Sequence, residues 1–176
     1  KIYSGYSWND DITIIDNRFI SERVNQLRNW NMEFIHGDIL DKELIKKYCY
    51  DADVVHHLAG ITNVPRVKSE RNDQNDNLIK RVAEEGTKNI LDVIDKKCKI
   101  IMPSTHVIYE GLESVKQELD EEEIPKPILS YGKSKFINEQ QLKESGKNYV
   151  ILRLGSVYGY STDTARIDIM ANFFAK

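Results

Sequence analysis

Tyr131 and Lys135 stand four residues apart in the run Tyr-Gly-Lys-Ser-Lys, at the start of a segment with helical spacing. At that spacing two side chains share one face of a helix. A nearby ammonium favours the phenolate, which makes Tyr131 a candidate acid/base for a hydroxyl whose carbon loses hydride. Thr105 could supply a hydroxyl that holds the same substrate oxygen. We therefore predict a catalytic set of Thr105, Tyr131 and Lys135.

A Tyr-x-x-x-Lys pair occurs often by chance, so its weight depends on the elements that would position it. Short β-rich runs alternate with helical stretches along the chain. The runs predicted as strands are 12–15, 33–36, 53–58, 99–102 and 149–153. The stretches predicted as helices are 41–48, 77–95 and 131–144, and Ser130 is expected to cap the last of them.

The predicted strands are short and nearly all apolar, as strands covered on both faces should be. No Asn-Gly or Asp-Gly hairpin signal separates them. Alternation of strands and helices without hairpins favours a parallel sheet, and right-handed crossovers limit it to doubly wound forms. The prediction is an α/β fold, with residues 110–129 as a long loop whose acidic run is typical of a solvated surface.

Ligands of open parallel sheets bind at the carboxyl ends of the strands. Asp16 follows the first predicted strand and can accept hydrogen bonds from ribose hydroxyls, while repelling a 2′-phosphate. The Asp-Asn pair is also a common turn. After the second strand, Asp38 can accept from an adenine amino group and Ile39 can cover the ring. Asp38 is equally suited to capping the helix that follows.

Leu58, Ala59 and Gly60 follow the third predicted strand. Small residues there let the backbone approach a cofactor, although they also form ordinary tight turns. The neighbouring His56 and His57 lie within the strand and point to opposite faces, so we predict one in the core, the other against a helix, and neither as a metal ligand.

Bulk composition excludes several classes of protein. The formal net charge is −3 with acids and bases interleaved, which does not fit the clustered basic face of a nucleic-acid-binding protein. The apolar stretches are too short to span a bilayer. Cys49 and Cys98 lie far apart without metal-type spacing, which favours buried or half-buried thiols in a reduced, cytoplasmic setting.

The order of these motifs resembles the extended short-chain dehydrogenase/reductase family, in its NAD-dependent epimerase/dehydratase branch. Seven segments carry the resemblance, and together they span nearly the whole chain: 14–17, 37–39, 55–60, 85–91, 104–109, 131–135 and 153–159. They match, in order, the end of the family's second strand, its adenine-contacting turn, its fourth-strand motif, its Gly-Thr-x-Asn-Leu helix, its Ser-Ser-x-x-Val-Tyr segment, its catalytic Tyr-x-x-x-Lys pair and its Arg-x-x-Asn-x-Tyr-Gly strand end.

The resemblance implies an NAD-binding site across the strand ends. Its expected cofactor-binding residues are Asp16, Asn17, Asp38, Ile39, Leu58, Ala59, Gly60, Tyr131 and Lys135. Lys135 would bond the nicotinamide ribose, and Tyr131 would take the proton from a sugar hydroxyl, commonly at C4. An epimerase would then return hydride to the other face of the keto-sugar.

The same resemblance implies a nucleotide-sugar substrate, with Thr62, His106 and Ser156 expected to contact it. It also implies a homodimer, in which the helices at 77–95 and 131–144 pair across a two-fold axis as a four-helix bundle.

The chain departs from the family pattern in several places. The family's first strand and Gly-rich phosphate loop are absent, and residues 1–7 resemble the tail of the helix behind that loop. We therefore expect a partial NAD-binding Rossmann domain at 1–160 and the start of a truncated substrate region at 161–176, with poor NAD binding and no activity from this stretch alone. Ala83 and Ser156 stand where the family carries Asn, and Glu110 stands where it carries Gly, near the pocket entrance.

Several reactions of this family remain open. Dehydratases carry an Asp-Glu pair after the catalytic Ser/Thr, and here those positions are His106 and Val107. The sequence therefore favours an NAD-dependent nucleotide-sugar epimerase over a dehydratase, with His106 as an acid/base or as a packing residue of the pocket. The alternatives are a reductase or decarboxylase of the same family, and a non-catalytic dinucleotide-binding protein, although such proteins tend to lose the Tyr and Lys that this chain keeps.

Overall fold

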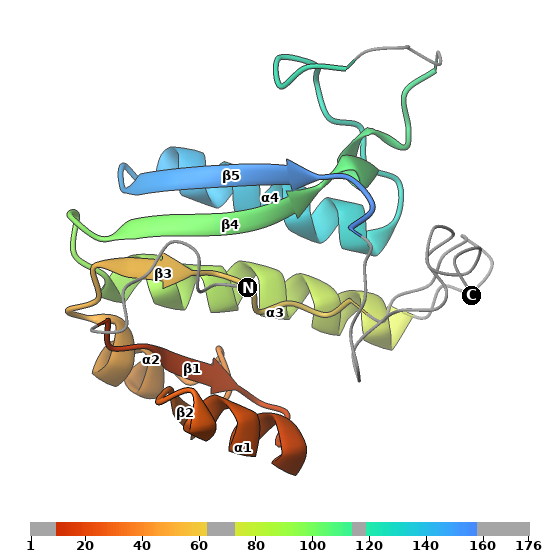
Figure 1. The fold of residues 1–176 in the computed structure, drawn as a ribbon. Coiled ribbons are helices and arrows are strands. Elements are labelled where there is room, and N and C mark those ends of the chain that lie inside the picture. The colour runs from red at the N-terminus through yellow and green to blue at the C-terminus, as the bar shows by residue number, and fades with distance from the viewer. Residues whose placement is uncertain (1–9, 63–72, 114–118, 158–176) are drawn as a thin grey trace.

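The computed structural model describes residues 10–62, 73–113 and 119–157 (Figure 1). Strands and helices alternate along the chain, as the sequence predicts. The elements are β1 (Thr13–Asp16), α1 (Ser21–Asn29), β2 (Glu33–His36), α2 (Lys42–Cys49), β3 (Val54–His56), α3 (Asp73–Val93), β4 (Lys99–Thr105), the 3-10 helix η3 (His106–Tyr109), α4 (Ser130–Glu144) and β5 (Asn148–Leu154).

The described strands form two parallel sheets. One pairs β1 with β2, from Thr13 opposite Glu33 to Asp16 opposite His36. In the other, β4 lies between β3 and β5. The arrows of β1, β3, β4 and β5 point the same way in Figure 1, so the carboxyl ends of the strands lie at one edge. The predicted α/β class with parallel strands is confirmed.

Helices α3 and α4 lie on one face of the three-stranded sheet (Figure 1). α2 packs against α3, α3 packs against α4, and α4 packs against β4 and β5. The core lies between these layers, where β4 contributes Ile100 and Met102, α3 contributes Ile90 and Val93, and α4 contributes Leu142. This core fixes α4 against the end of β4, where the predicted catalytic residues lie.

Burial is more one-sided than the apolar strands predict. β4 alternates fully buried with half-buried residues, whereas β1, β2, β3 and β5 contain no fully buried residue. Figure 1 shows α3 and α4 behind the three-stranded sheet, with no helix of the described residues in front of it. The exposed Leu152 and Leu154 of β5 belong to these incompletely covered strands.

The predicted helices 41–48, 77–95 and 131–144 correspond to α2, α3 and α4, although α3 begins earlier, at Asp73. The sequence analysis missed α1 and η3. Helix α1 is almost entirely polar and buries only Val24 among its residues, so it lacks the apolar periodicity that signals a helix.

The predicted cap of α4 is wrong. Ser130 lies inside the helix, its N-cap is Leu129, and that residue makes no side-chain cap. The Ser130 hydroxyl instead donates a hydrogen bond to Asp76 of α3. Ser130 therefore ties the starts of the two helices together.

The predicted burial of the cysteines is confirmed, since Cys98 is buried and Cys49 is half-buried, and the structure pairs neither of them in a disulfide. The predicted loop 110–129 has no helix or strand in its described residues, and its stretch 114–118 lies outside them. The predicted domain boundary at 160, and the assignment of residues 1–7, also lie outside the described residues. In the described part of the chain, none of the helices combines the length and the apolar character that a membrane span requires.

Candidate active site

Thr105 ends β4 and begins the turn that carries the site. It is buried, and its Oγ1 accepts a hydrogen bond from the backbone N–H of Val107 at 3.2 Å, which makes it the N-cap of η3. A hydroxyl has one donor and two acceptor positions. Thr105 can therefore cap η3 and still donate its proton to an oxygen placed beyond the strand end.

Tyr131 and Lys135 lie on the first turns of α4, which pack tightly against η3. A Cβ built on Gly132 would lie 3.2 Å from the carbonyl oxygen of Val107, closer than side chains usually approach. Glycine at this position thus lets α4 reach the turn that follows Thr105. Tyr131 is half-buried there.

Lys135 is a buried ammonium, with 8% of its surface exposed. Burial lowers the pKa of Lys135 from its ordinary value, because the charged form loses hydration. Its Nζ lies 3.9 Å from the position that a Cβ of Gly60 would take. The structure therefore brings Lys135 to the turn after β3, where Leu58, Ala59 and Gly60 are all exposed and Thr62 follows.

A buried polar network lies beneath this pair. His57 Nε2 lies 2.7 Å from the Thr87 hydroxyl, and the Asn138 amide donates to the same hydroxyl at 2.7 Å and to the Ala83 carbonyl at 2.8 Å. Complete burial, with a smaller contribution from Lys135, lowers the pKa of His57 to about 3. The imidazole is therefore neutral, and it joins β3 to α3, which in turn is joined to α4.

The histidine prediction is confirmed in part. We predicted one of the two histidines in the core and the other against a helix. His57 is both buried and in contact with α3, whereas His56 is exposed. At position 83 the backbone carbonyl of Ala83, rather than an asparagine side chain, accepts the bond from Asn138. Asn138 gave no signal in the sequence, because an isolated polar residue in a helix usually faces solvent.

A second buried cluster contacts the end of β4 through Ser104. Glu139 of α4 is fully buried, accepts a hydrogen bond from the Ser104 hydroxyl at 2.6 Å and pairs with Arg153 at 2.8 Å. The Glu139 carboxylate raises the pKa of Arg153. Arg153 also donates to the hydroxyl of Tyr109 at 2.5 Å, so the cluster links β4, β5, η3 and α4. The sequence analysis missed Glu139.

The predicted adenosine-binding residues meet at the ends of β1 and β2. Asp16 Oδ1 accepts from the backbone N–H of Arg18 at 2.8 Å, and the Asn17 amide donates to Asp38 Oδ2 at 3.1 Å. The other Asp38 oxygen accepts from Leu40 N–H at 2.9 Å. The alternative role of Asp38 as a helix cap is wrong, because α2 is capped by Asp41.

Ile39 faces α3 with its side chain. A Cβ on Gly86 would lie 2.8 Å from Ile39 Cγ2, and the Ile39 carbonyl accepts from the Asn89 amide at 3.0 Å. The side chain packs against the core cluster. Ile39 thus anchors the turn that carries Asp38.

The predicted substrate-contacting residues lie at the same strand edge. His106 is exposed, and its Nδ1 lies 3.2 Å from the Leu154 carbonyl, where β5 ends. Ser156 follows β5 and is exposed. The end of β4 and the end of β5 therefore present these two polar side chains together.

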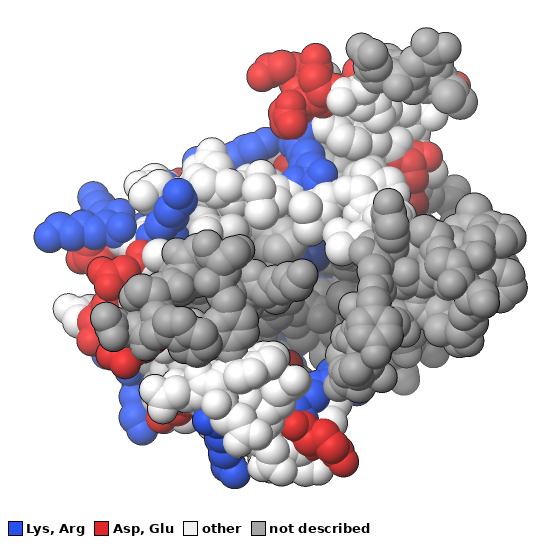
Figure 2. All heavy atoms as spheres, in the orientation of Figure 1, with Lys and Arg blue, Asp and Glu red and all other residues white. Residues whose placement is uncertain are grey.

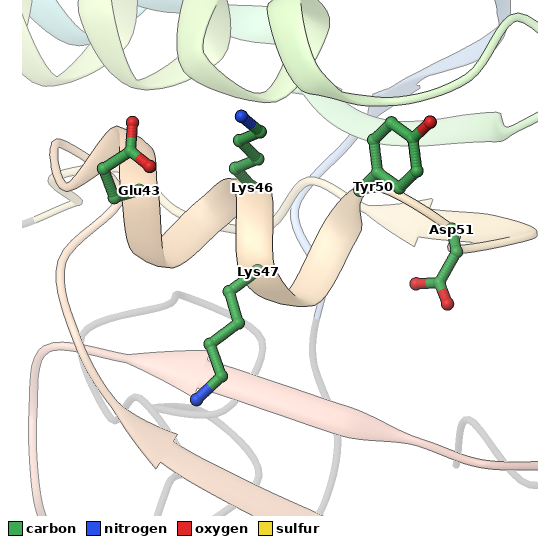
Figure 3. Close-up of a pocket in the computed structure, with 5 residues that line it drawn as sticks. All are labelled: Glu43, Lys46, Lys47, Tyr50 and Asp51. Atoms are coloured by element: carbon green, nitrogen blue, oxygen red, sulfur yellow. The ribbon is translucent and has the colours of Figure 1, made fainter.

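A pocket elsewhere on the described surface does not include these residues. A pocket of about 400 Å³ beside α2 is lined by Glu43, Lys46, Lys47, Tyr50 and Asp51 (Figure 3). None of these is a predicted site residue, and Asp51 precedes β3, at the opposite end of that strand from Gly60.

Figure 2 shows both signs of charge scattered over the visible face. The described residues include no group of three or more potential metal ligands.

Comparison with known proteins gives the chain a family. It matches the model described as the NAD dependent epimerase/dehydratase family over residues 7–176. A protein of Methanocaldococcus jannaschii, whose name assigns it to UDP-glucose 4-epimerase, is 33% identical over 88% of this chain and 50% of its own length. A protein of Haloferax volcanii, named for a reductase of low-salt glycan biosynthesis, is 30% identical over 73% of this chain and 41% of its own length.

A solved structure shares the fold. UDP-glucuronic acid 4-epimerase from Bacillus cereus in complex with NAD aligns with a TM-score of 0.72 and 26% identity, covering 98% of this chain and 54% of that one. The chain therefore spans about half the length of the relatives it matches.

Proposed function

We propose, from the premise that this chain belongs to the NAD-dependent epimerase/dehydratase family, that the protein it represents is an NAD-dependent nucleotide-sugar epimerase. The observation that carries the proposal is a packing contact at the end of β4. The turn after Thr105 packs there against α4, the helix that bears Tyr131 and Lys135. Similarity to proteins named as UDP-sugar 4-epimerases supports the choice of reaction.

The residues at the strand edge fit a dinucleotide. Asp16 and Asp38 offer carboxylates at one end, and Lys135 offers a buried ammonium beside the exposed turn at Gly60. An acidic residue at this place in an open α/β sheet hydrogen-bonds a ribose, and small residues permit a close approach of the backbone. Asn17, Leu58 and Ala59 complete the proposed cofactor contacts, with Ile39 supporting the turn from behind.

NAD, when bound, supplies the hydride acceptor and donor. In our proposal Tyr131 removes the proton from a sugar hydroxyl, and Thr105 donates a hydrogen bond to the same oxygen. Lys135 favours the phenolate of Tyr131 by its charge. The buried hydrogen bonds of His57, Thr87 and Asn138 join the end of β3 to α3 and to α4, the helix that carries Lys135. Thr62, His106 and Ser156 are proposed to contact the sugar.

We also propose that the protein is a homodimer through the predicted helices 77–95 and 131–144. These correspond to α3 and α4, which already pack against each other within one chain. Leu78, near the start of α3, is an exposed apolar side chain suited to such a contact. A native mass of two chains would support this part of the proposal, and a monomer at micromolar concentration would contradict it.

The first test uses the full-length protein from its natural source gene. Native mass spectrometry after purification should show an increment equal to one NAD per chain, since a cofactor recycled within each turnover need not leave. Incubation with UDP-glucose or UDP-glucuronic acid should then give the C4 epimer, detected by proton NMR.

Tyr131→Phe removes only the hydroxyl that moves the proton. We expect the rate of epimer formation to fall by about 10²–10⁴-fold, while the NAD content and the unfolding temperature stay unchanged. An active Tyr131→Phe enzyme would refute the catalytic assignment. Loss of NAD in the variant would instead indicate that Tyr131 serves binding.

A reductase of the same family is the second candidate, and similarity to the Haloferax volcanii protein favours it. A reductase consumes its cofactor in each turnover, so NAD(P)H must exchange. Protein that purifies without cofactor, and that oxidises added NADH or NADPH in the presence of a nucleotide keto-sugar, would support the reductase over the epimerase.

A further inference from the structure

One exposed side chain joins η3 to the start of α4. Glu110 directly follows η3, and its Oε1 accepts hydrogen bonds from the backbone N–H groups of Ile128 at 2.8 Å and Leu129 at 2.5 Å. Leu129 is the N-cap residue of α4 and makes no side-chain cap of its own. Glu110 therefore accepts hydrogen bonds from the two backbone N–H groups that directly precede α4.

The backbone around Glu110 is already close to the same segment. Gly111 N–H donates to the Lys126 carbonyl at 3.0 Å, and Lys126 N–H donates to the Ile108 carbonyl at 2.8 Å. A Cβ on Gly111 would lie 2.3 Å from the Lys126 oxygen, which no other residue type could tolerate without displacing the chain. The Glu110 carboxylate extends this backbone pairing by two residues toward α4.

The position of the carboxylate matters for the site. η3 begins immediately after Thr105, and Tyr131 is the second residue of α4. The bonds to Ile128 and Leu129 therefore connect the two elements that carry these side chains, in addition to the packing of Gly132 against the Val107 carbonyl. A negative charge is also favoured at this place, because the N-terminus of a helix carries partial positive charge and N–H bonds to a carboxylate are strong.

We propose that Glu110 is a positioning residue that sets the separation between Thr105 and Tyr131 by bracing the start of α4. The roles of Thr105 and Tyr131 rest on the proposed function. Glu110 touches neither the proton nor the sugar, and it acts through the backbone of residues 128 and 129. It stands where the pattern of the family that the sequence resembles carries Gly.

The test compares three variants of the full-length protein with bound NAD. Glu110→Ala removes the acceptor, whereas Glu110→Gln keeps an oxygen that can accept the same two bonds. Glu113→Gln is the matched control, because Glu113 is an exposed carboxylate of the same loop that contacts only the Lys126 ammonium in the described residues.

We expect Glu110→Ala to lower kcat by about 10- to 100-fold, because small displacements of reacting groups are costly, while KM for the sugar and the NAD content change by less than about twofold. Glu110→Gln should recover most of kcat, and Glu113→Gln should match the wild type. A wild-type kcat in Glu110→Ala would overturn the proposal, and so would an equal loss in Glu113→Gln.

Amide hydrogen exchange separates this inference from the proposed function. In Glu110→Ala the N–H groups of Ile128 and Leu129 should exchange about tenfold faster or more, since each loses a bond to a charged acceptor. If the wild type forms no epimer, the proposed function fails, and the exchange rates still decide whether Glu110 braces α4. Unchanged exchange at both amides would overturn the brace.

Discussion

The two ends of the strand edge are built differently. We call Thr105, Tyr131 and Lys135 the catalytic end, and Asp16, Asn17 and Asp38 the adenosine end. Thr105 and Lys135 are buried, and they lie over fully buried polar side chains such as Glu139. Asp16 and Asn17 are exposed, and their hydrogen bonds join neighbouring turns at the surface.

The difference fits the roles that we propose for the two ends. In the proposed reaction the groups that exchange a proton must be held within a fraction of an ångström, so the side chains assigned to that step need rigid support. A carboxylate that receives a ribose hydroxyl must remain accessible, and a surface turn is sufficient to orient it. We therefore expect substitutions at the catalytic end to lower stability and turnover, and substitutions at the adenosine end to lower the affinity for the cofactor.

The largest effect on folding is expected from Glu139→Ala at the catalytic end. This change leaves the Arg153 guanidinium and the Ser104 hydroxyl without their buried partner. Breaking a buried ion pair on one side costs about 3–5 kcal/mol of unfolding free energy. Urea unfolding of the full-length protein, followed by circular dichroism, measures the loss.

Lys143→Ala is the control for Glu139→Ala. Lys143 lies 3.9 Å from the same carboxylate, but its side chain is largely exposed, so the change should cost less than about 1 kcal/mol. The contrast between the two ends would be refuted if Glu139→Ala lowered the free energy of unfolding no more than Asp16→Ala does at the adenosine end.

The next effect is a pH dependence of stability that arises from His57, which lies close to Lys135 of the catalytic end. The pKa of His57 is lowered from 6.5 to about 3 in the folded protein, because burial disfavours the imidazolium. Below pH 6.5 the unfolded chain binds a proton that the folded chain does not, so folding loses stability as the pH falls from 6.5 toward 3. Between pH 8 and pH 5 the loss amounts to about 2 kcal/mol.

The variant His57→Gln isolates this contribution. Glutamine does not titrate, and its amide can still bond the Thr87 hydroxyl. The difference in unfolding free energy between wild type and variant should therefore shift by about 2 kcal/mol in favour of the variant between pH 8 and pH 5. A difference that stays constant with pH would mean that His57 is not held neutral.

The sequence predicted where Asp16, Asp38 and the Tyr131–Lys135 pair lie in the fold better than it predicted the buried residues around them. Strand ends follow from short apolar runs, so the placement of Asp16 and Asp38 at the ends of β1 and β2 could be read from the pattern. Tyr131 and Lys135 share a helix, and their spacing alone puts them on one face. For these residues the relevant contacts are local in the chain.

The supporting residues depend on contacts between distant segments. Asn138 bonds Ala83 and Thr87 from more than fifty positions away, and Glu139 meets Arg153 only because α4 packs on β5. A polar residue in a helix gives no sign of whether it faces solvent or a buried partner. Helix α1 could not be predicted from the sequence either, because it is polar and has no apolar stripe at helical spacing.

The smallest effect, and the one confined to the adenosine end, is expected from Asp16→Asn. An Asn keeps an oxygen for the Arg18 N–H, so the turn should persist, and the unfolding free energy should change by less than about 1 kcal/mol. The charged acceptor that we assign to the ribose is lost, which should raise the Kd for NAD by about tenfold. Repulsion of a 2′-phosphate is lost as well, so the preference for NAD over NADP should narrow. Titration of cofactor-free protein with NAD and with NADP measures both Kd values.

The value of kcat at saturating NAD should match the wild type in this variant. A fall in kcat comparable to that of Tyr131→Phe would show that the two ends are coupled, because binding of the adenosine at β1 would then set the geometry of the side chains at the end of β4.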